Sequence, residues 1–129
     1  MGASVRVAVV QASPVRMDRD ATTEKACRLI EEAGERGAEL VLLPEVLIPG
    51  YPRGFGFGSL VGSRSDEGRR SFARYWANSV ESPGPVVEAL GAAAAKASSY
   101  AVVGVSERES GLRGGTLYNT LLYFGPDGR

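Results

Sequence analysis

Apolar positions along the chain fall into two kinds of pattern, short continuous runs and stripes with helical spacing. Each of three short runs predicts a β-strand. They are residues 5–10 (VRVAVV), typical of a strand covered on both faces, residues 40–43 (LVLL), which Pro44 closes, and residues 100–106 (YAVVGVS). A fourth run, residues 116–124 (TLYNTLLYF), follows a polar stretch and predicts the second strand of a hairpin.

Three apolar stripes predict amphipathic helices between these strands. Asp18 or Asp20 can cap the first helix, which Gly34 and Gly37 end, and Pro85 suits the first turn of the third. The stripes are Ala26, Leu29, Ile30 and Ala33; Phe72, Tyr75, Trp76 and Val80; and Val86, Val87, Leu90, Ala93, Ala94 and Ala97. The resulting order of strand, helix, strand, loop, two helices and two strands predicts an α/β fold with a largely parallel sheet.

The end of the predicted sheet indicates that the fold continues. Residues 124–129 (FGPDGR) place Pro-Asp-Gly directly after the last strand, where such residues normally turn a chain into its next element. Native domains seldom leave a long apolar edge strand open. Although 129 residues suffice for one core, we therefore expect residues 1–129 to form one segment at the front of a larger domain.

Composition narrows the classes of partner. Fifteen basic and fifteen acidic residues give a formal net charge of +0, which argues against nucleic acid or a charged membrane surface as partner. The chain has no apolar stretch long enough to span a membrane and no pattern of a secretory leader, so we expect a cytoplasmic protein. With no histidine and with Cys27 as the single cysteine, the sequence predicts no zinc or other transition-metal site.

Glu45 is the strongest candidate for chemistry. It directly follows Pro44 at the carboxyl end of a predicted strand, and open α/β sheets place their sites beyond such ends. Leu42, Leu43 and Val46 around it predict partial desolvation, which raises the pKa of a carboxyl towards the range of a general base. The alternative is a solvated loop glutamate, because most carboxylates at strand ends are not catalytic.

Residues 40–69, LVLLPEVLIPGYPRGFGFGSLVGSRSDEGR, resemble the nitrilase branch of the carbon–nitrogen hydrolase superfamily. The resemblance extends over nearly the whole chain. Its other segments are VAVVQASPV at 7–15, RYWANSVESPGP at 74–85, VVGVSERE at 102–109 and GGTLYNTLLYFGPDGR at 114–129. Such a long ordered set of segments is more specific than a short motif, and it favours the catalytic interpretation of Glu45.

The resemblance implies the N-terminal part of an α-β-β-α sandwich, with Glu45 as the general base of a Glu-Lys-Cys triad. Such an enzyme hydrolyses a nitrile to a carboxylic acid and ammonia through a cysteine thioimidate, without a metal or organic cofactor. Tyr51 and Phe55 would line the nitrile pocket, although Phe55 could equally pack the loop onto the sheet. The resemblance also implies a homo-oligomer in the full-length form.

The same resemblance implies that two catalytic residues lie outside this chain. The family's lysine follows the Pro-Asp-Gly turn and its cysteine comes later still, whereas the sequence ends at Arg129. Cys27 and Lys96 are predicted on helices and do not match those positions. We therefore expect the chain alone to be inactive. A truncated remnant or split-protein partner, and an amidase or carbamoylase of the same superfamily, are the alternatives.

Two further features have weaker functional interpretations. The glycine-rich stretch GFGFGSLVG at 54–62 has neither the spacing nor the strand-to-helix context of a phosphate-binding loop, so nucleotide binding is disfavoured. Asn119, in the last predicted strand, could hydrogen-bond beside the site, but a structural amide with its own partner is the favoured interpretation.

Overall fold

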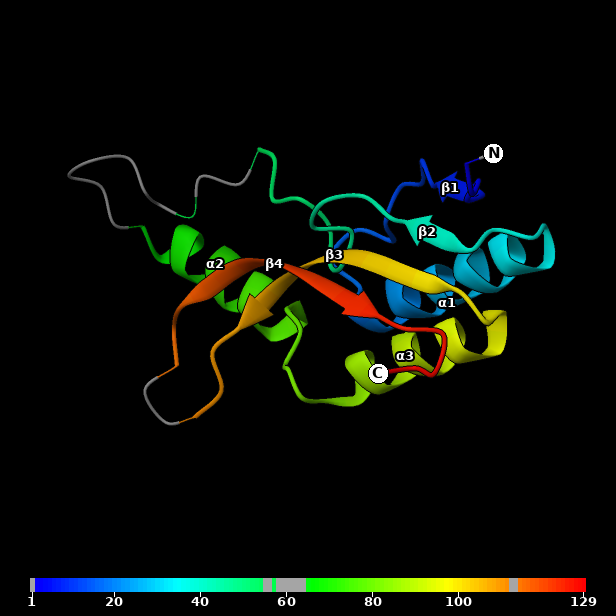
Figure 1. The fold of residues 1–129 in the computed structure, drawn as a ribbon. Coiled ribbons are helices and arrows are strands. Elements are labelled where there is room, and N and C mark those ends of the chain that lie inside the picture. Colours follow the sequence, from blue (N-terminus) through cyan, green and yellow to red (C-terminus); the bar gives the residue numbers. More distant parts are fainter. Residues whose placement is uncertain (1, 55–56, 58–64, 112–113) are drawn as a thin grey trace.

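The order of helices and strands agrees with the order that the sequence predicts. The structure is a computed structural model that describes residues 2–54, 57, 65–111 and 114–129. In these residues the elements are β1 (Val7–Val9), α1 (Arg19–Glu35), β2 (Leu40–Leu42), α2 (Asp66–Asn78), α3 (Pro85–Ala97), β3 (Tyr100–Arg108) and β4 (Leu117–Phe124) (Figure 1). The structure thus confirms the α/β class.

The strands form one mixed sheet in the order β1-β2-β3-β4. β1 pairs with β2 and β2 with β3 in parallel, while β3 and β4 form the antiparallel hairpin that the sequence predicts. The largest differences from the predicted boundaries concern two elements. Strand β1 is shorter than residues 5–10, and α2 ends at Asn78, so Val80 lies beyond the helix and bridges to Glu107 of β3.

Local sequence explains where the first helix begins and how closely it packs. Asp18, not Asp20, is the N-cap of α1, and its side chain accepts a hydrogen bond from the backbone N–H of Ala21 at 2.9 Å. Near the other end of α1, a Cβ on Gly34 would lie 2.7 Å from the Cβ of Ala97. The two helices α1 and α3 therefore approach closely because a glycine faces a small residue.

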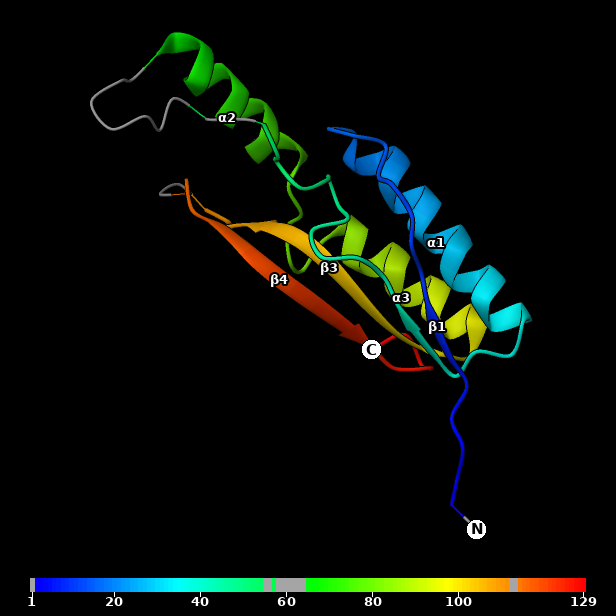
Figure 2. The ribbon, with the colours of Figure 1, turned by 90° about the horizontal axis from the view of Figure 1, so that it is seen from above.

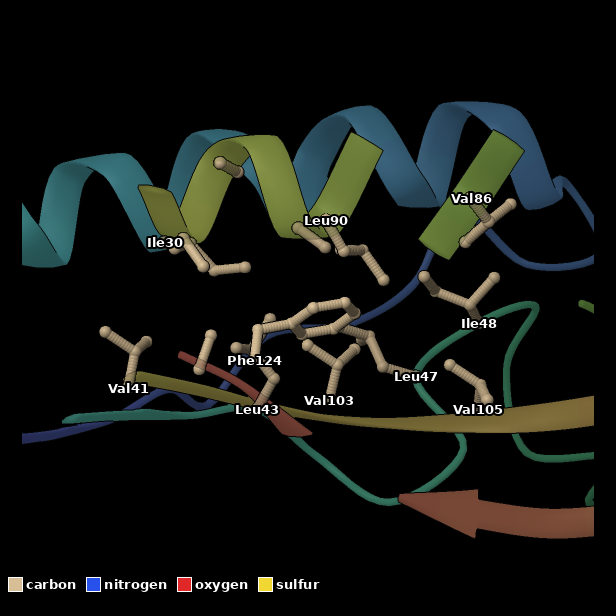
Figure 3. Close-up of a cluster of buried hydrophobic side chains, with 14 of the residues drawn as sticks. Ile30, Val41, Leu43, Leu47, Ile48, Val86, Leu90, Val103, Val105 and Phe124 are labelled. Carbon is tan, nitrogen blue, oxygen red and sulfur yellow. The ribbon is translucent and has the colours of Figure 1, made fainter. Parts of the chain in front are cut away.

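The hydrophobic core lies between the sheet and the pair α1 and α3. Figure 3 shows Ile30, Leu90 and Val86 on the helices above side chains from the strands and from the segment after β2. The fully buried members at the centre of this cluster include Ile30, Val41, Ile48, Leu90, Val103 and Val105. Burying aliphatic side chains of this size contributes roughly 1.5–3 kcal/mol each to folding, so this layer dominates the stability of the chain.

The opposite side of the sheet, which we call the outer face, is not covered by α1 or α3 (Figure 2), and α2 contacts it at Arg108, the last residue of β3. By the strand register it carries the side chains of Val7, Val9, Leu42, Tyr100, Leu121 and Tyr123, all of them exposed. Val9 is 70% and Tyr123 69% exposed. The prediction that the first strand is covered on both faces is therefore wrong for this chain, because Val7 and Val9 of β1 are exposed on the outer face.

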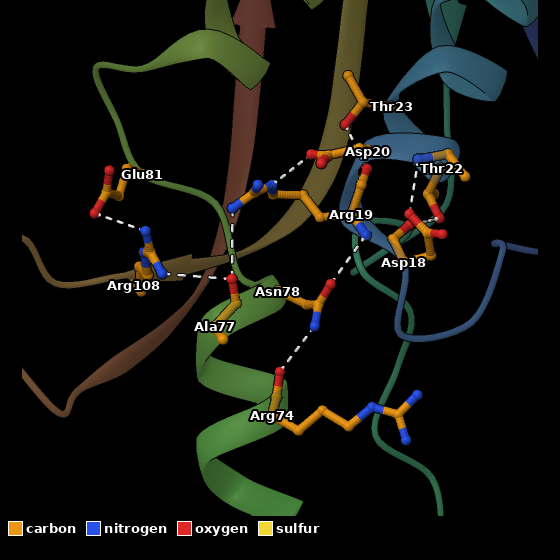
Figure 4. Close-up of polar contacts among 11 residues, drawn as sticks. Asp18, Arg19, Asp20, Thr22, Thr23, Arg74, Ala77, Asn78, Glu81 and Arg108 are labelled. Atoms are coloured by element: carbon orange, nitrogen blue, oxygen red, sulfur yellow. Dashed lines mark hydrogen bonds and ion pairs between the residues drawn. The ribbon is translucent and has the colours of Figure 1, made fainter.

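Helix α2 is joined to the rest of the molecule at its C-terminal end. The carbonyl oxygen of Ala77 accepts hydrogen bonds from the side chains of Arg19 and Arg108, and Arg108 also forms an ion pair with Glu81 at 2.8 Å (Figure 4). The Asn78 side chain accepts from the backbone N–H of Arg19 at 3.3 Å. Arginines from α1 and β3 thus donate hydrogen bonds at the C-terminal end of α2, where carbonyl groups without partners in the helix attract cations.

The described helices are too short or too polar to cross a membrane. Within residues 2–54, 57, 65–111 and 114–129, no helix has the length and apolar character needed to cross a membrane.

Candidate active site

The candidate site lies on the outer face of the sheet, where the chain leaves β2. The backbone N–H of Leu43 still bonds to the carbonyl of Val102 on β3, at 2.9 Å, and Ile48 rejoins the neighbourhood of β3 by donating to the carbonyl of Gly104. Residues 44–47 between these contacts form a turn that crosses β3, and Glu45 lies on that turn.

Gly104 allows the turn to cross β3 at close range. A Cβ at this position would lie 2.5 Å from the carbonyl oxygen of Pro44 and 2.6 Å from the Cα of Glu45, distances that no side chain tolerates. The turn also contains Val46 with a φ of +45°, a conformation that is costly for a β-branched residue. Strain of this kind is concentrated at functional sites, where the surrounding structure enforces it.

The crossing brings Glu45 to β4, where it contacts Asn119. The side-chain nitrogen Nδ2 of Asn119 donates to Oε1 of Glu45 at 2.6 Å, between residues 74 positions apart in sequence. Asn119 therefore has a hydrogen-bond partner, as the sequence favours, and that partner is Glu45 beside the candidate site. A hydrogen bond to an ionised carboxylate is stronger than one between neutral groups.

A groove of about 530 Å³ opens beside this pair. Its walls are mostly apolar and come from β1, from β2 with the following turn, and from β4. The lining residues are Val9, Val10, Leu42, Leu43, Pro44, Glu45, Asn119 and Leu121. An apolar groove with a few polar groups at one point is the usual form of a small-molecule site.

Glu45 is exposed in this chain, whereas Leu43 and Val46 on either side of it are buried. The predicted desolvation of the carboxylate is therefore not present in the described structure. The reason is the bare outer face, since the sheet protects the buried neighbours while Glu45 points to the open side. Here the carboxylate is accessible to solvent, and one of its oxygens accepts a hydrogen bond from Asn119.

The structure does not unite the other candidate residues with Glu45. Tyr51 is 60% exposed and is not among the described residues that line the groove. Phe55 lies outside the described residues. The placements of Tyr51 and Phe55 in a nitrile pocket therefore stay predictions.

Cys27 and Lys96 lie on the helices, as the sequence predicts. Cys27 is half-buried between α1 and α3, its thiol contacts the carbonyl of Ala89, and desolvation together with nearby Glu31 raises the pKa of the thiol. A raised pKa makes the thiol a poor nucleophile. Lys96 is exposed, and its ion pair with Glu31 at 2.6 Å raises the pKa of the ammonium group.

The side chains of the described residues include no cluster of three or more metal-ligating groups (cysteine, histidine or carboxylate) that could hold a metal ion. The candidate site therefore consists of one carboxylate, Glu45, and one amide, Asn119, at the edge of an apolar groove. Such an arrangement can accept a proton and bind a small uncharged molecule.

The chain belongs to the carbon–nitrogen hydrolase family, whose pattern it matches over residues 6–129. It is 50% identical over 123 residues to an aliphatic nitrilase of Sinorhizobium fredii (strain HH103), covering 95% of this chain and 39% of the relative. It is 48% identical over 125 residues to nitrilase 2 of Arabidopsis thaliana, covering 97% of this chain and 36% of that protein. The chain thus spans well under half the length of these relatives.

A solved structure supports the fold. The crystal structure of a carbon–nitrogen hydrolase from Helicobacter pylori G27 matches with a TM-score of 0.53 and 20% identity, over 97% of this chain and 36% of that one. At this identity the likeness concerns the arrangement of helices and strands alone.

Proposed function

We propose that this chain supplies the general base of a nitrilase, an enzyme that hydrolyses a nitrile to a carboxylic acid and ammonia. The observation that carries the proposal is the position of Glu45, on a turn built over Gly104, at the edge of an apolar groove. The named nitrilases at about half identity support the choice of substrate class. An apolar groove and a net charge of +0 suit a small uncharged substrate.

The proposed reaction consumes two waters. A cysteine thiol adds to the nitrile carbon, and its proton passes by way of Glu45 to the nitrile nitrogen, which gives a thioimidate. The first water adds to that carbon and expels ammonia, leaving a thioester. A second water, deprotonated by Glu45, cleaves the thioester to the carboxylic acid and returns the thiol. The reaction needs no metal or organic cofactor.

We further propose that the 129-residue chain is inactive alone. The described residues that line the groove include neither a thiol nor an amine, and both are needed for the triad that the family resemblance implies. Removing one member of such a unit generally abolishes most of its effect. The missing groups would come from a C-terminal portion, and the assembled enzyme is proposed to be a homo-oligomer. We also propose a cytoplasmic location, since Cys27, as the single cysteine, gives this chain no internal disulfide that would point to secretion.

Complementation tests the role of Glu45. We expect the chain, mixed or co-expressed with the C-terminal remainder of the S. fredii aliphatic nitrilase, to release ammonia from an aliphatic nitrile, which neither part does alone. In this two-part preparation, Glu45→Gln should lower the rate by a factor of at least about 100, because the amide cannot accept the proton. The matched control is Glu39→Gln, at the N-terminal end of β2 and away from Glu45. It should retain the rate, because the amide oxygen of glutamine can still accept the bond from the backbone N–H of Arg6. Full ammonia release with Glu45→Gln would refute the assignment.

The same triad suits amides and carbamoyl compounds, so an amidase or carbamoylase is the second candidate. Ammonia release from an amide but not from the matching nitrile would favour the second candidate. Failure of complementation with both substrates would favour a remnant without catalysis.

A further inference from the structure

We propose that Asn119 is a positioning residue for Glu45. By donating from Nδ2 to Oε1, it holds the carboxylate on the outer face and leaves Oε2 as the oxygen that accepts a proton. The inference rests on the proposed function, since it concerns how the base of that reaction is oriented. It assigns a task to a residue of β4, a strand remote in sequence from the turn that carries Glu45.

The sheet register explains why these two side chains meet. On the hairpin, Gly104 pairs with Leu121 and Ser106 with Asn119, so the outward side chain of Asn119 lies beside the gap above Gly104. The turn of residues 44–47 passes through that gap. Glu45 can therefore reach β4 only because β3 presents a glycine where the turn crosses it.

Asn119 is chemically out of place among its neighbours on the strand. The other residues of β4 that share the outer face by register are Leu117, Leu121 and Tyr123, all apolar or aromatic. An amide in an apolar row is costly when the surface is covered, unless it keeps a hydrogen-bond partner. Glu45 is the partner that the structure provides.

A purely structural role accounts poorly for this contact. Both side chains are exposed, and an exposed hydrogen bond contributes little to the free energy of unfolding. Its effect on a catalytic carboxylate is larger, because a glutamate rotates about three side-chain bonds and only a narrow range of positions allows proton transfer. A misplacement of about 1 Å can lower a rate by a factor of roughly 100.

The contact itself is tested by NMR in the 129-residue chain, at a concentration at which sedimentation velocity finds a monomer. We expect the side-chain amide protons of Asn119 to resonate downfield of those of an unbonded asparagine and to shift back in Glu45→Ala. Thr120→Val is the matched control. It removes the bond from the Thr120 hydroxyl to Glu107 at 2.8 Å, on the neighbouring residue and the opposite face. Amide protons of Asn119 that do not respond to Glu45→Ala would overturn the proposal.

The consequence is tested by kinetics in the two-part preparation. Asn119→Leu should lower kcat by roughly 10- to 100-fold with KM changed less than about 3-fold and the melting temperature unchanged. Asn119→Asp, which has the same shape but repels Glu45, should lower kcat at least as far. Asn119→Gln, which keeps the donor, should recover part of the loss, and Thr120→Val should retain the parent kcat.

The two proposals fail in different ways. If Glu45→Gln abolishes ammonia release while Asn119→Leu keeps the parent kcat, Glu45 is the base and the positioning role of Asn119 is refuted. If ammonia release survives Glu45→Gln, the proposed function fails. The NMR comparison decides the contact between the two side chains whether or not the preparation is active.

Discussion

At the scale of single residues, the geometry of the candidate site depends most on Gly104. A methyl group there would meet the carbonyl oxygen of Pro44 at 2.5 Å, and this contact is with backbone, which cannot rotate away. We expect Gly104→Ala to destabilise the chain by about 1–3 kcal/mol, as overpacking does, and to displace Glu45. Chemical denaturation measures the first effect, and ammonia release in the two-part preparation measures the second.

Gly111→Ala is not a suitable control, because its φ of +111° strains any other residue. Gly115→Ala is suitable, since a Cβ there meets nothing within 4 Å. If Gly104→Ala leaves both stability and the rate unchanged, the crossing over β3 does not have the described geometry.

Sequence and structure contributed different residues to the site. The sequence predicted Glu45 because a strand end and a family motif are local signals. It did not single out Gly104 or Val46 and did not identify Glu45 as the partner of Asn119, because these contacts depend on which strands are neighbours and in which register. A turn that crosses one strand to reach the next leaves no local pattern.

At the scale of elements, α2 depends on Arg108 of β3. Its guanidinium pairs with Glu81, donates to the carbonyl of Ala77 and lies 4.5 Å from the centre of the Trp76 ring. We expect Arg108→Ala to lower the free energy of unfolding by about 1–2 kcal/mol, since a half-buried ion pair and a cation–π contact are lost together. Circular dichroism during urea denaturation checks the value.

A lysine at position 108 separates the effect of the positive charge from that of the planar guanidinium group. Arg108→Lys keeps the positive charge but not the planar fork, so it should recover only part of the loss. Arg70→Ala, at an exposed position of α2, is the control and should change stability by less than about 0.5 kcal/mol. Equal effects of Arg108→Ala and Arg70→Ala would contradict the anchoring role.

Element types and their order could be predicted because helical spacing and short apolar runs are repeated local signals. Two details could not. Val80 matches the helical stripe of α2, yet it bridges to Glu107, since pairing with a strand outweighs a single matching position. The run at residues 5–10 resembles a strand buried on both sides, but local sequence does not reveal which layers cover a sheet.

At the scale of the whole molecule, the bare outer face is the dominant feature. Helices α1 and α3 cover one side of the sheet, whereas Val9, Leu42, Leu121 and Tyr123 stay exposed on the other. Contiguous apolar surface of this kind drives association, and a formal net charge of +0 offers little repulsion against it. The α-β-β-α sandwich that the family resemblance implies would cover this face with further chain.

We therefore expect the 129-residue chain alone to self-associate through its outer face. Sedimentation velocity should show the average mass rising with concentration, and Leu121→Lys should raise the monomer fraction, because a buried lysine in the contact is costly. Ala92→Lys adds the same charge on the exposed side of α3 and is the matched control.

Addition of the C-terminal remainder should suppress association in the parent chain but less so with Leu121→Lys, since both partners need the same surface. A parent chain that stays monomeric at all concentrations would show that the outer face does not drive self-association. An equal effect of Ala92→Lys would place the contact between chains on another surface.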